Sequence, residues 1–153
     1  MQQLPDSAQE LRARALRLLA RREHSRAELA RKLAPHAGSR EALDQLLDAL
    51  EAKKQLSDGR YAEERARVLS RKYGAARIRH DLRAKGISEE VIERTSASGE
   101  EDFERARAIL ARKYRTCATT REERARRARF LQGRGFSYDI IRRALGVSSA
   151  DTE

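Results

Sequence analysis

The middle of the chain reads Leu69-Ser-Arg-Lys-Tyr73, then Ile78-Arg-His-Asp-Leu82, then Lys85-Gly-Ile-Ser88 and Val91-Ile92. This order predicts a helix that ends in a basic cluster, followed after Gly74 by a second, short helix. Gly86 is the residue best suited to a left-handed turn that ends the second helix. Ser88 then caps a third helix and is followed by two glutamates, which favour its positive end. The stretch therefore predicts three short helices joined by tight turns.

The same pattern occurs before and after this stretch. The earlier copy reads Leu19-Ala-Arg-Arg-Glu23, then Leu29-Ala-Arg-Lys-Leu33, then the apolar series Leu43, Leu46, Leu47 and Leu50. The later copy reads Leu110-Ala-Arg-Lys-Tyr114, then Phe130-Leu131, then Arg134-Gly-Phe-Ser137 and Ile140-Ile141. Three copies of one supersecondary unit indicate a tandem-repeat protein, in which each unit buries its apolar face partly against its neighbours.

The expected fold is all-α, with about nine helices in three tandem three-helix repeats, each similar to a helix-turn-helix, in an elongated or curved arrangement. We place the repeats at residues 7–57, 58–98 and 99–147, with loose termini at 1–6 and 148–153. Apolar residues at helical spacing predict the buried stripes, which in the first helix are Leu11, Ala15, Leu18 and Leu19.

Polar residues at the predicted helix starts supply the caps. Ser25 with Glu28, and Thr120 with Glu123, have the spacing of a capping box, in which each side chain bonds the other residue's backbone N–H. Single caps are expected at Ser39, Asp58, Ser88 and Ser137. These positions predict where the helices begin.

The chain is strongly basic, with 34 lysines and arginines against 24 aspartates and glutamates and a net charge of +10 at pH 7. Such an excess predicts attraction to a polyanion, either a nucleic acid or an acidic protein surface. The single cysteine, Cys117, excludes an intramolecular disulfide, and no apolar run approaches membrane-spanning length. We therefore expect a cytoplasmic protein with no membrane partner, and a monomer because no long apolar stripe is left unused.

Residue patterns typical of enzymes are missing from the sequence. His24, His36 and His80 stand on different predicted elements without a cysteine or carboxylate at metal-ligand spacing. There is no glycine-rich phosphate loop, no nucleophile elbow and no two-metal carboxylate cluster. The expectation is a protein that binds a partner, with no catalytic residue, metal or cofactor.

Two rows of basic residues are the candidate binding residues, because residues three and four apart share a helix face. The first row is Arg60, Arg67, Arg71, Lys72, Arg77 and Lys85, and the second is Arg121, Arg124, Arg127 and Arg134. Any single arginine is more often solvated or paired with an acid, and Arg65 is the particular candidate for a structural ion pair. As sets, the rows predict contact with an anionic partner.

The tyrosines allow two interpretations. Tyr61, Tyr73, Tyr114 and Tyr138 could stack on nucleic-acid bases if their rings are exposed. Tyr73 and Tyr114 occupy equivalent repeat positions beside Arg-Lys at helix ends, which favours packing between helices.

Several segments together are similar to one known family. They are Leu56-Ser-Asp-Gly-Arg-Tyr-Ala-Glu63, Arg71-Lys-Tyr-Gly74, Arg77-Ile78, Asp81-Leu82, Lys85-Gly-Ile87, Arg129-Phe-Leu131, Arg134-Gly-Phe136 and Ile140-Ile141. They resemble the RecX family of regulators of the RecA recombinase, over about residues 10 to 146. The middle section is the specific part. Two departures are a longer joint at 114–120 and Asp81 in place of a frequent glutamate.

The resemblance implies an all-helical protein of three three-helix repeats. It implies binding to RecA in the helical groove of its filament on single-stranded DNA. It also implies inhibition of recombination, ATP hydrolysis and co-protease action, and so a role in DNA repair and the SOS response. Charge reversal of Arg71, Lys72 and Arg77 together is predicted to abolish this inhibition.

Two other classes of function compete with this interpretation. A basic DNA-binding protein that acts without RecA would also have short helices and tight turns, although no recognition helix with base-reading residues stands out. A helical-repeat adaptor for protein ligands would have a similar pattern, but the tetratricopeptide signature is missing. A salt series of DNA binding separates the DNA-binding class from a RecA-dependent one.

Overall fold

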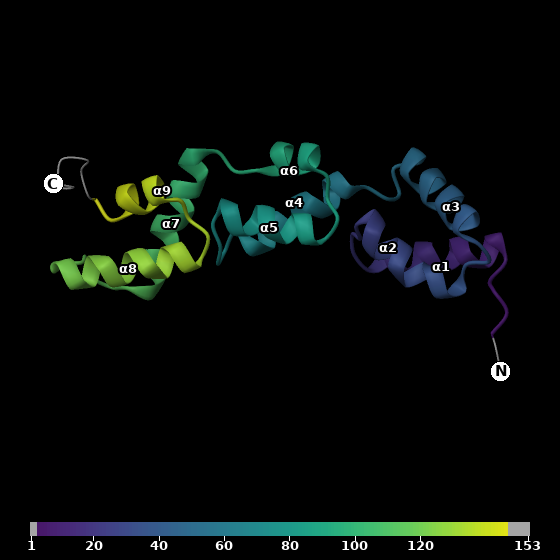
Figure 1. Ribbon diagram of the computed structural model, residues 1–153, viewed down its shortest axis with the longest axis horizontal. Coiled ribbons are helices and arrows are strands. Elements are labelled where there is room, and N and C mark those ends of the chain that lie inside the picture. The colour runs from purple at the N-terminus through teal and green to yellow at the C-terminus, as the bar shows by residue number, and fades with distance from the viewer. Residues whose placement is uncertain (1–2, 147–153) are drawn as a thin grey trace. The chain divides into compact units, whose positions relative to one another are not determined.

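The computed structural model describes residues 3–146, and within that range the chain forms helices and no strand (Figure 1). The α-helices are α1 (Ala8–Arg21), α2 (Arg26–Leu33), α3 (Arg40–Ala52), α4 (Asp58–Leu69), α5 (Ala75–Ala84), α6 (Glu89–Thr95), α7 (Gly99–Lys113), α8 (Arg121–Gly133) and α9 (Tyr138–Ala144). A short 3-10 helix, η1 (Ala34–His36), follows α2. The segment 148–153, expected to be loose, lies outside the described residues. So do residues 1 and 2.

The chain divides into two compact units. The first comprises the described residues up to Glu64 together with Leu82–Ile92. The second comprises Arg65–Asp81 and the described residues from Glu93 onward. Helices α4, α5 and α6 therefore each supply residues to both units.

Where α1, α2 and α3 of the first unit meet, the core cluster is built almost entirely from leucines. Its buried members are Leu11 and Ala15 of α1, Leu29 and Leu33 of α2, Leu43, Leu47 and Leu50 of α3, and Leu56. Leu18, Leu19 and Leu46 pack against this cluster and are partly buried. The stripes predicted from helical spacing are confirmed, because each apolar face lies against the other two helices. On the N-terminal side, the Asp6 N–H donates to the carbonyl of His36 at 2.8 Å.

The second unit has a separate core around α7, α8 and α9. Ala106 and Ile109 of α7, Leu131 of α8, and Phe136, Ile140 and Ile141 are buried there. The apolar pairs quoted from the third repeat thus form the contact surface of its three helices.

A histidine is buried in the first unit, and both of its ring nitrogens are bonded. His24 is 2% exposed, with Nδ1 3.1 Å from the carbonyl oxygen of Arg22 and Nε2 3.2 Å from Nζ of Lys32. A carbonyl only accepts, so Nδ1 carries the proton, and Nε2 accepts from the Lys32 ammonium. Burial lowers the pKa of His24, which favours this neutral form.

Most of the predicted helix caps are confirmed. The hydroxyls of Ser25, Ser39 and Ser137 accept from the backbone N–H three residues on, at 3.0, 3.1 and 3.4 Å. Thr120 and Glu123 form the full reciprocal capping box. The Ser25 box was only half right, since the Glu28 carboxylate pairs with the Arg22 guanidinium at 2.7 Å.

The predicted cap at Asp58 was wrong. Ser57 takes that role, because its hydroxyl accepts from the N–H of Arg60 at 3.2 Å. Asp58 instead begins α4, and its carboxylate accepts from the N–H of Arg26 at 2.7 Å. Since Arg26 is the first residue of α2, Asp58 caps a helix of the preceding repeat.

Gly86 belongs to the same contact between the first and second repeats. A Cβ placed on Gly86 would come within 2.9 Å of the Cβ of Ala27, on α2. Its φ of +81° is also in the left-handed region that glycine adopts most readily. Asp58 and Gly86 therefore both hold the second repeat on the start of α2.

The third repeat is held on the second in the same way. The carboxylate of Asp102 on α7 accepts from the N–H of Ala75, the first residue of α5, at 3.1 Å. Gly135 has a φ of +90°, and a Cβ there would come within 2.4 Å of the Cβ of Arg77, also on α5. Each junction thus uses an aspartate that caps, and a glycine that contacts, the second helix of the preceding repeat.

Asp102 differs from Asp58 in being buried. It is 5% exposed, and this desolvation raises the pKa of its carboxyl above the usual range. The hydrogen bond from Ala75 acts in the opposite direction, because it favours the charged carboxylate. The second junction therefore contains a carboxylate inside the protein.

Candidate functional site

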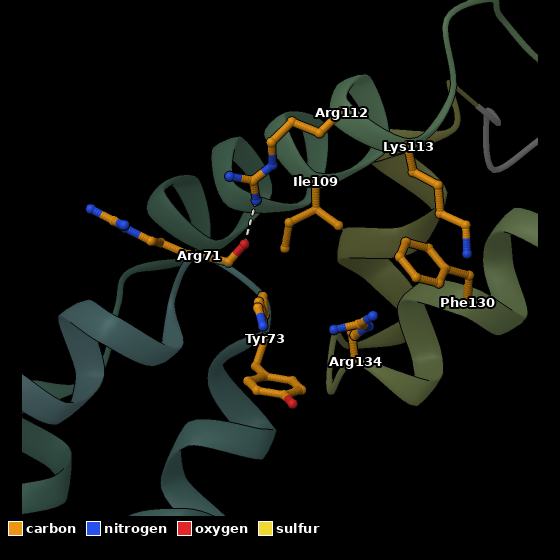
Figure 2. Close-up of a pocket in the computed structure, with 8 residues that line it drawn as sticks. Arg71, Tyr73, Ile109, Arg112, Lys113, Phe130 and Arg134 are labelled. Atoms are coloured by element: carbon orange, nitrogen blue, oxygen red, sulfur yellow. Dashed lines mark hydrogen bonds between the residues drawn. The ribbon is translucent and has the colours of Figure 1, made fainter.

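Three of the predicted basic residues lie in one groove of the second unit. Arg71, Lys72 and Arg134 line a hollow of about 680 Å³ (Figure 2). The other lining residues are Tyr73, Ile109, Arg112, Lys113 and Phe130. We call this feature the basic groove. Among the described residues, no aspartate or glutamate lines it.

The basic groove is formed by three segments of the chain. Arg71 and Lys72 follow α4, Arg112 and Lys113 end α7, and Arg134 follows α8. The guanidinium of Arg112 donates to the backbone carbonyl of Arg71, the contact dashed in Figure 2. The carbonyl of Arg134 accepts from the N–H of Gly74 at 2.7 Å. These two hydrogen bonds bring the segments together, and both use main-chain acceptors.

Two aromatic rings support the cations of the groove. The guanidinium carbon of Arg134 lies 5.5 Å from the ring centre of Tyr73 and 5.2 Å from that of Phe130. The ammonium of Lys113 lies 3.8 Å from the centre of the Phe130 ring. Such contacts hold a cation by the negative face of the ring and leave its N–H groups able to donate elsewhere.

The remaining predicted cations of the second unit lie outside the groove. Arg77 lies over the Tyr73 ring at 4.7 Å from its centre. Arg127 donates to the carbonyl of Thr116 at 2.8 Å and lies over Tyr114. Arg67 and Arg121 are exposed and Arg124 is partly buried. Arg77 and Arg127 therefore have structural contacts.

The two predicted cations of the first unit have different surroundings. Arg60 pairs with Glu23 at 2.9 Å, so its charge is compensated within the protein. Lys85 is exposed and makes no ion pair with a described carboxylate.

The prediction that Arg65 forms a structural ion pair is confirmed. Its Nε and Nη2 donate to the two carboxylate oxygens of Asp81 at 2.9 and 3.0 Å. This two-point contact joins α4 to α5 and is the geometry in which arginine binds a carboxylate best.

Arg112 and Lys113 were missed by the sequence interpretation. The signal was available, because Leu110-Ala-Arg-Lys-Tyr114 repeats Leu69-Ser-Arg-Lys-Tyr73. The structure brings these two equivalent Arg-Lys pairs to one groove. Repeat symmetry therefore identifies the missing half of the site better than helical spacing does.

The tyrosines at the helix ends pack within the protein. Tyr73 and Tyr114 are both partly buried, and Tyr114 meets Phe130 edge-on with ring centres 6.2 Å apart. Tyr138 is an exposed residue, at 64%. Both rings at the groove, Tyr73 and Phe130, have a cation within about 6 Å of the ring centre.

Neither a cluster of metal-ligating side chains nor a membrane-spanning helix is found in the described part of the chain. No three His, Cys, Asp or Glu side chains gather there as a metal ion would require. None of the helices found there has the length and apolar character needed to cross a membrane.

Comparison with known families gives a match over most of the chain. The models for the first, second and third three-helix domains of RecX match residues 12–50, 57–95 and 100–145. The regulatory protein RecX of Leptothrix cholodnii is 43% identical over 139 residues, which are 90% of this chain and 88% of that protein. That of Chromobacterium violaceum is 39% identical over 141 residues, or 92% of each chain.

A solved structure shows the same fold. The crystal structure of RecX from Lactobacillus salivarius matches with a TM-score of 0.80 and 23% identity, over 91% of this chain and 94% of that chain. Together with the three domain models, it confirms the predicted all-α fold of three-helix repeats.

Proposed function

Since this chain belongs to the RecX family of regulatory proteins, we propose that it binds the filament formed by the RecA recombinase on single-stranded DNA. Binding inhibits the recombinase, ATPase and co-protease activities of that filament. The protein acts in the cytoplasm as a single chain, by occupying its partner and without a catalytic residue of its own.

The observation that supports this proposal is the basic groove. Five cationic side chains line it without a described carboxylate, so their charges repel one another until an anion is bound. A filament on DNA offers such anions, both as phosphates and as acidic protein surface. Arg121, which is exposed in the same unit, adds positive charge that steers the encounter.

Tandem repeats suit a filament partner for a second reason. A chain with several weak contacts gains affinity when its target repeats, because each later contact forms at high effective concentration. The three three-helix domains are the repeated units of this chain, whereas the Arg-Lys pairs at 71–72 and 112–113 lie in one groove and form a single contact.

An alternative function is supported by the same groove: binding to DNA without RecA. Here the protein would compete with RecA for the strand, and affinity for bare DNA would equal or exceed affinity for the filament.

Co-sedimentation separates these two functions. RecA is assembled on single-stranded DNA with a non-hydrolysable ATP analogue, and the chain is added at substoichiometric amounts. The proposal predicts that the chain pellets with the filament at concentrations at which it remains in solution with DNA alone. Equal binding to bare DNA and filament would favour the alternative, and no pelleting with the filament would overturn the proposal.

A further inference from the structure

The basic groove is divided between two repeats. Arg71, Lys72 and Tyr73 come from the end of α4 in the second repeat, whereas every other lining residue comes from α7, α8 or the turn after α8 in the third. Both halves belong to the second compact unit of the chain. The cations therefore lie together only while these two repeats keep their contact.

The start of α5 holds the two halves together. The N–H groups of three successive residues, Gly74, Ala75 and Ala76, donate to acceptors in the third repeat. The Gly74 N–H bonds the carbonyl of Arg134 at 2.7 Å. The Ala76 N–H bonds the carbonyl of Gly135 at 3.2 Å. N–H groups at the start of a helix have no partner within that helix. Because these residues directly follow the second-repeat half of the groove, the bonds fix its position.

Asp102 supplies the third acceptor, and it is the only side chain among the three. Its carboxylate accepts from the N–H of Ala75 at 3.1 Å. Asp102 is 5% exposed and lies in the first turn of α7. A carboxylate bonds an N–H at the start of a helix more strongly than a neutral carbonyl does, and the helix dipole favours its charge. A substitution can remove this contact, whereas the two carbonyls belong to the main chain.

Asp102 acts on the groove from a distance, because it does not line the hollow. Arg112 lies about 15 Å farther along α7, at about 1.5 Å per residue. At that end of α7, Arg112 donates to the carbonyl of Arg71, as Figure 2 shows. Helix α7 therefore contacts the second repeat through both of its ends. Attachment at both ends keeps the two sets of cations facing the same hollow.

We propose that Asp102 is a positioning residue of the basic groove, which by holding the N–H of Ala75 keeps Arg71 and Lys72 in place to engage an anionic partner. This inference rests on the proposed function, because the RecA filament is the partner that the groove would meet. Loss of the Asp102 acceptor lets the second-repeat half move away from the third-repeat half. Only molecules with both halves in place bind fully, so the apparent affinity falls in proportion to the fraction that keeps them there.

The sign of the effect separates positioning from simple charge attraction. Asp102 is an acid in a chain with a net charge of +10, so its replacement by a neutral residue makes the protein more positive. Charge attraction to an anionic filament would then become stronger or stay the same. Positioning predicts the opposite for Asp102→Ala, which is weaker inhibition of RecA. Asp102→Asn has the same charge as Asp102→Ala but keeps an oxygen that accepts from Ala75, so it is expected to restore inhibition.

The concentration that halves ATP hydrolysis by RecA on single-stranded DNA is measured for wild-type chain, both Asp102 variants and two controls. Glu101→Ala removes an exposed carboxylate from the same turn of α7 and leaves the Ala75 contact intact. Ile141→Val removes a methyl-sized group from the core of α7, α8 and α9, and so lowers stability without changing the junction. Circular dichroism at the assay temperature establishes that all variants are folded.

Asp102→Ala is expected to require about fivefold more protein than wild type, the factor that corresponds to the loss of one helix cap. Asp102→Asn and the two controls are expected to differ from wild type by less than about twofold, since each keeps an acceptor for Ala75. Hydrogen exchange of the Gly74 and Ala76 amides measures the junction without RecA. Their exchange is expected to be faster in Asp102→Ala and unchanged in Asp102→Asn.

Three results would overturn the inference: inhibition by Asp102→Ala at the wild-type concentration, equal weakening in Asp102→Asn, or equal weakening in Ile141→Val. Failure of the proposed function looks different, because wild-type chain would then leave RecA ATP hydrolysis unchanged. The exchange of the Gly74 and Ala76 amides would in that case still decide whether Asp102 holds the two halves together. Unchanged exchange in Asp102→Ala would overturn the inference by itself.

Discussion

At the scale of single residues, the two aspartates of the repeat junctions contribute more than their sequence positions suggest. Each accepts a hydrogen bond from the first N–H of a helix in another repeat, at 2.7 Å for Asp58 and 3.1 Å for Asp102. Such an N–H has no partner within its own helix. Asp102 does this while buried, so its carboxylate forms the contact against a desolvation cost.

The first prediction concerns Asp102. Asp102→Ala leaves the N–H of Ala75 without its acceptor, so the free energy of unfolding of the second unit is expected to fall by about 1 to 2 kcal/mol. Asp102→Asn keeps an oxygen acceptor and removes the buried charge, and is expected to be about as stable as wild type. Urea denaturation followed by hydrogen exchange of the α5 amides measures both. Equal stability of the Ala and Asn variants would show that the cap contributes nothing.

The second prediction concerns acid stability of the first unit. The hydrogen bond with Arg22 lowers the pKa of Glu28 from 4.5 to about 2, and burial lowers the pKa of His24. Both folded pKa values lie below the unfolded ones, so their stabilisation is present near neutral pH and is lost as pH falls. Asp102 acts in the opposite sense in the second unit, because its folded pKa is raised.

Hydrogen exchange of the α2 amides between pH 7 and pH 2 measures this loss. The full shift in the Glu28 pKa would correspond to ~3 kcal/mol of free energy of unfolding. Because its partner Arg22 is half-exposed and screened by solvent, the expected loss of stability is about 1 kcal/mol. Glu28→Gln is expected to flatten the profile between pH 4.5 and pH 2. A profile for Glu28→Gln that follows wild type would contradict this assignment.

The helix caps show which hydrogen bonds the sequence predicts correctly and which it does not. Ser39 and Ser137 were predicted as caps because the acceptor and donor lie three residues apart in the chain. Asp58 was misassigned because its partner, Arg26, is 32 residues away. A hydrogen bond between residues three positions apart can be predicted from the local sequence. The donor to the Asp58 carboxylate is decided by the tertiary fold, because that donor lies far away in the chain.

Among the helices and turns, the turns before α6 and α9 show why the motifs at 85–87 and 134–136 contain glycine. Gly86 and Gly135 both have positive φ, and both lie against the second helix of the preceding repeat. The turn therefore ends one helix and also provides the contact between repeats.

The third prediction tests this double role with a matched pair of glycines. Gly135→Ala places a Cβ within 2.4 Å of the Cβ of Arg77 and in the left-handed region, so we expect a loss of about 2 to 4 kcal/mol in the second unit. Gly133→Ala lies two residues away at the end of α8, where a Cβ meets nothing within 4 Å. It is expected to leave stability unchanged or raise it by up to about 1 kcal/mol. Thermal denaturation compares the two variants, and similar losses in both would contradict the contact.

The order and type of the elements were predictable from the sequence, whereas their docking was not. Apolar spacing, serine caps and glycine turns are local signals that occur three times. The approach of Gly135 to Arg77 and the bond from Asp102 to Ala75 join residues far apart in the chain, so no local pattern reports them. The similarity of the two junctions becomes visible only when Asp58 is compared with Asp102 and Gly86 with Gly135 at equivalent positions of the repeats.

At the level of the complete chain, the net charge predicts an anionic partner, and the tertiary structure shows which of the predicted cations lie together in one groove. Of the ten cations predicted to bind, Arg71, Lys72 and Arg134 line the basic groove. Arg60 and Arg127 are used within the protein, by Glu23 and by Thr116. Helical spacing alone does not predict which of these cations will bond to a carboxylate or a carbonyl of the same protein.

Arg77 also changes the design of the charge-reversal experiment. It lies over Tyr73, and Gly135 packs against its backbone, so its replacement would disturb the junction as well as the charge. Arg71→Glu with Lys72→Glu is the cleaner variant, because both side chains are exposed. Arg126→Glu with Arg129→Glu makes the same change in charge elsewhere in the second unit and is the control.

Wild-type chain, Arg71→Glu with Lys72→Glu, and the control are each titrated into RecA on single-stranded DNA, and the rate of ATP hydrolysis shows whether the basic groove engages the filament. Wild-type chain and the control are expected to inhibit at similar concentrations. Arg71→Glu with Lys72→Glu is expected to require at least about tenfold more protein, equivalent to ~1.4 kcal/mol of binding free energy. Inhibition by this variant at wild-type concentration, with its helices intact, would contradict the claim that the basic groove engages the filament.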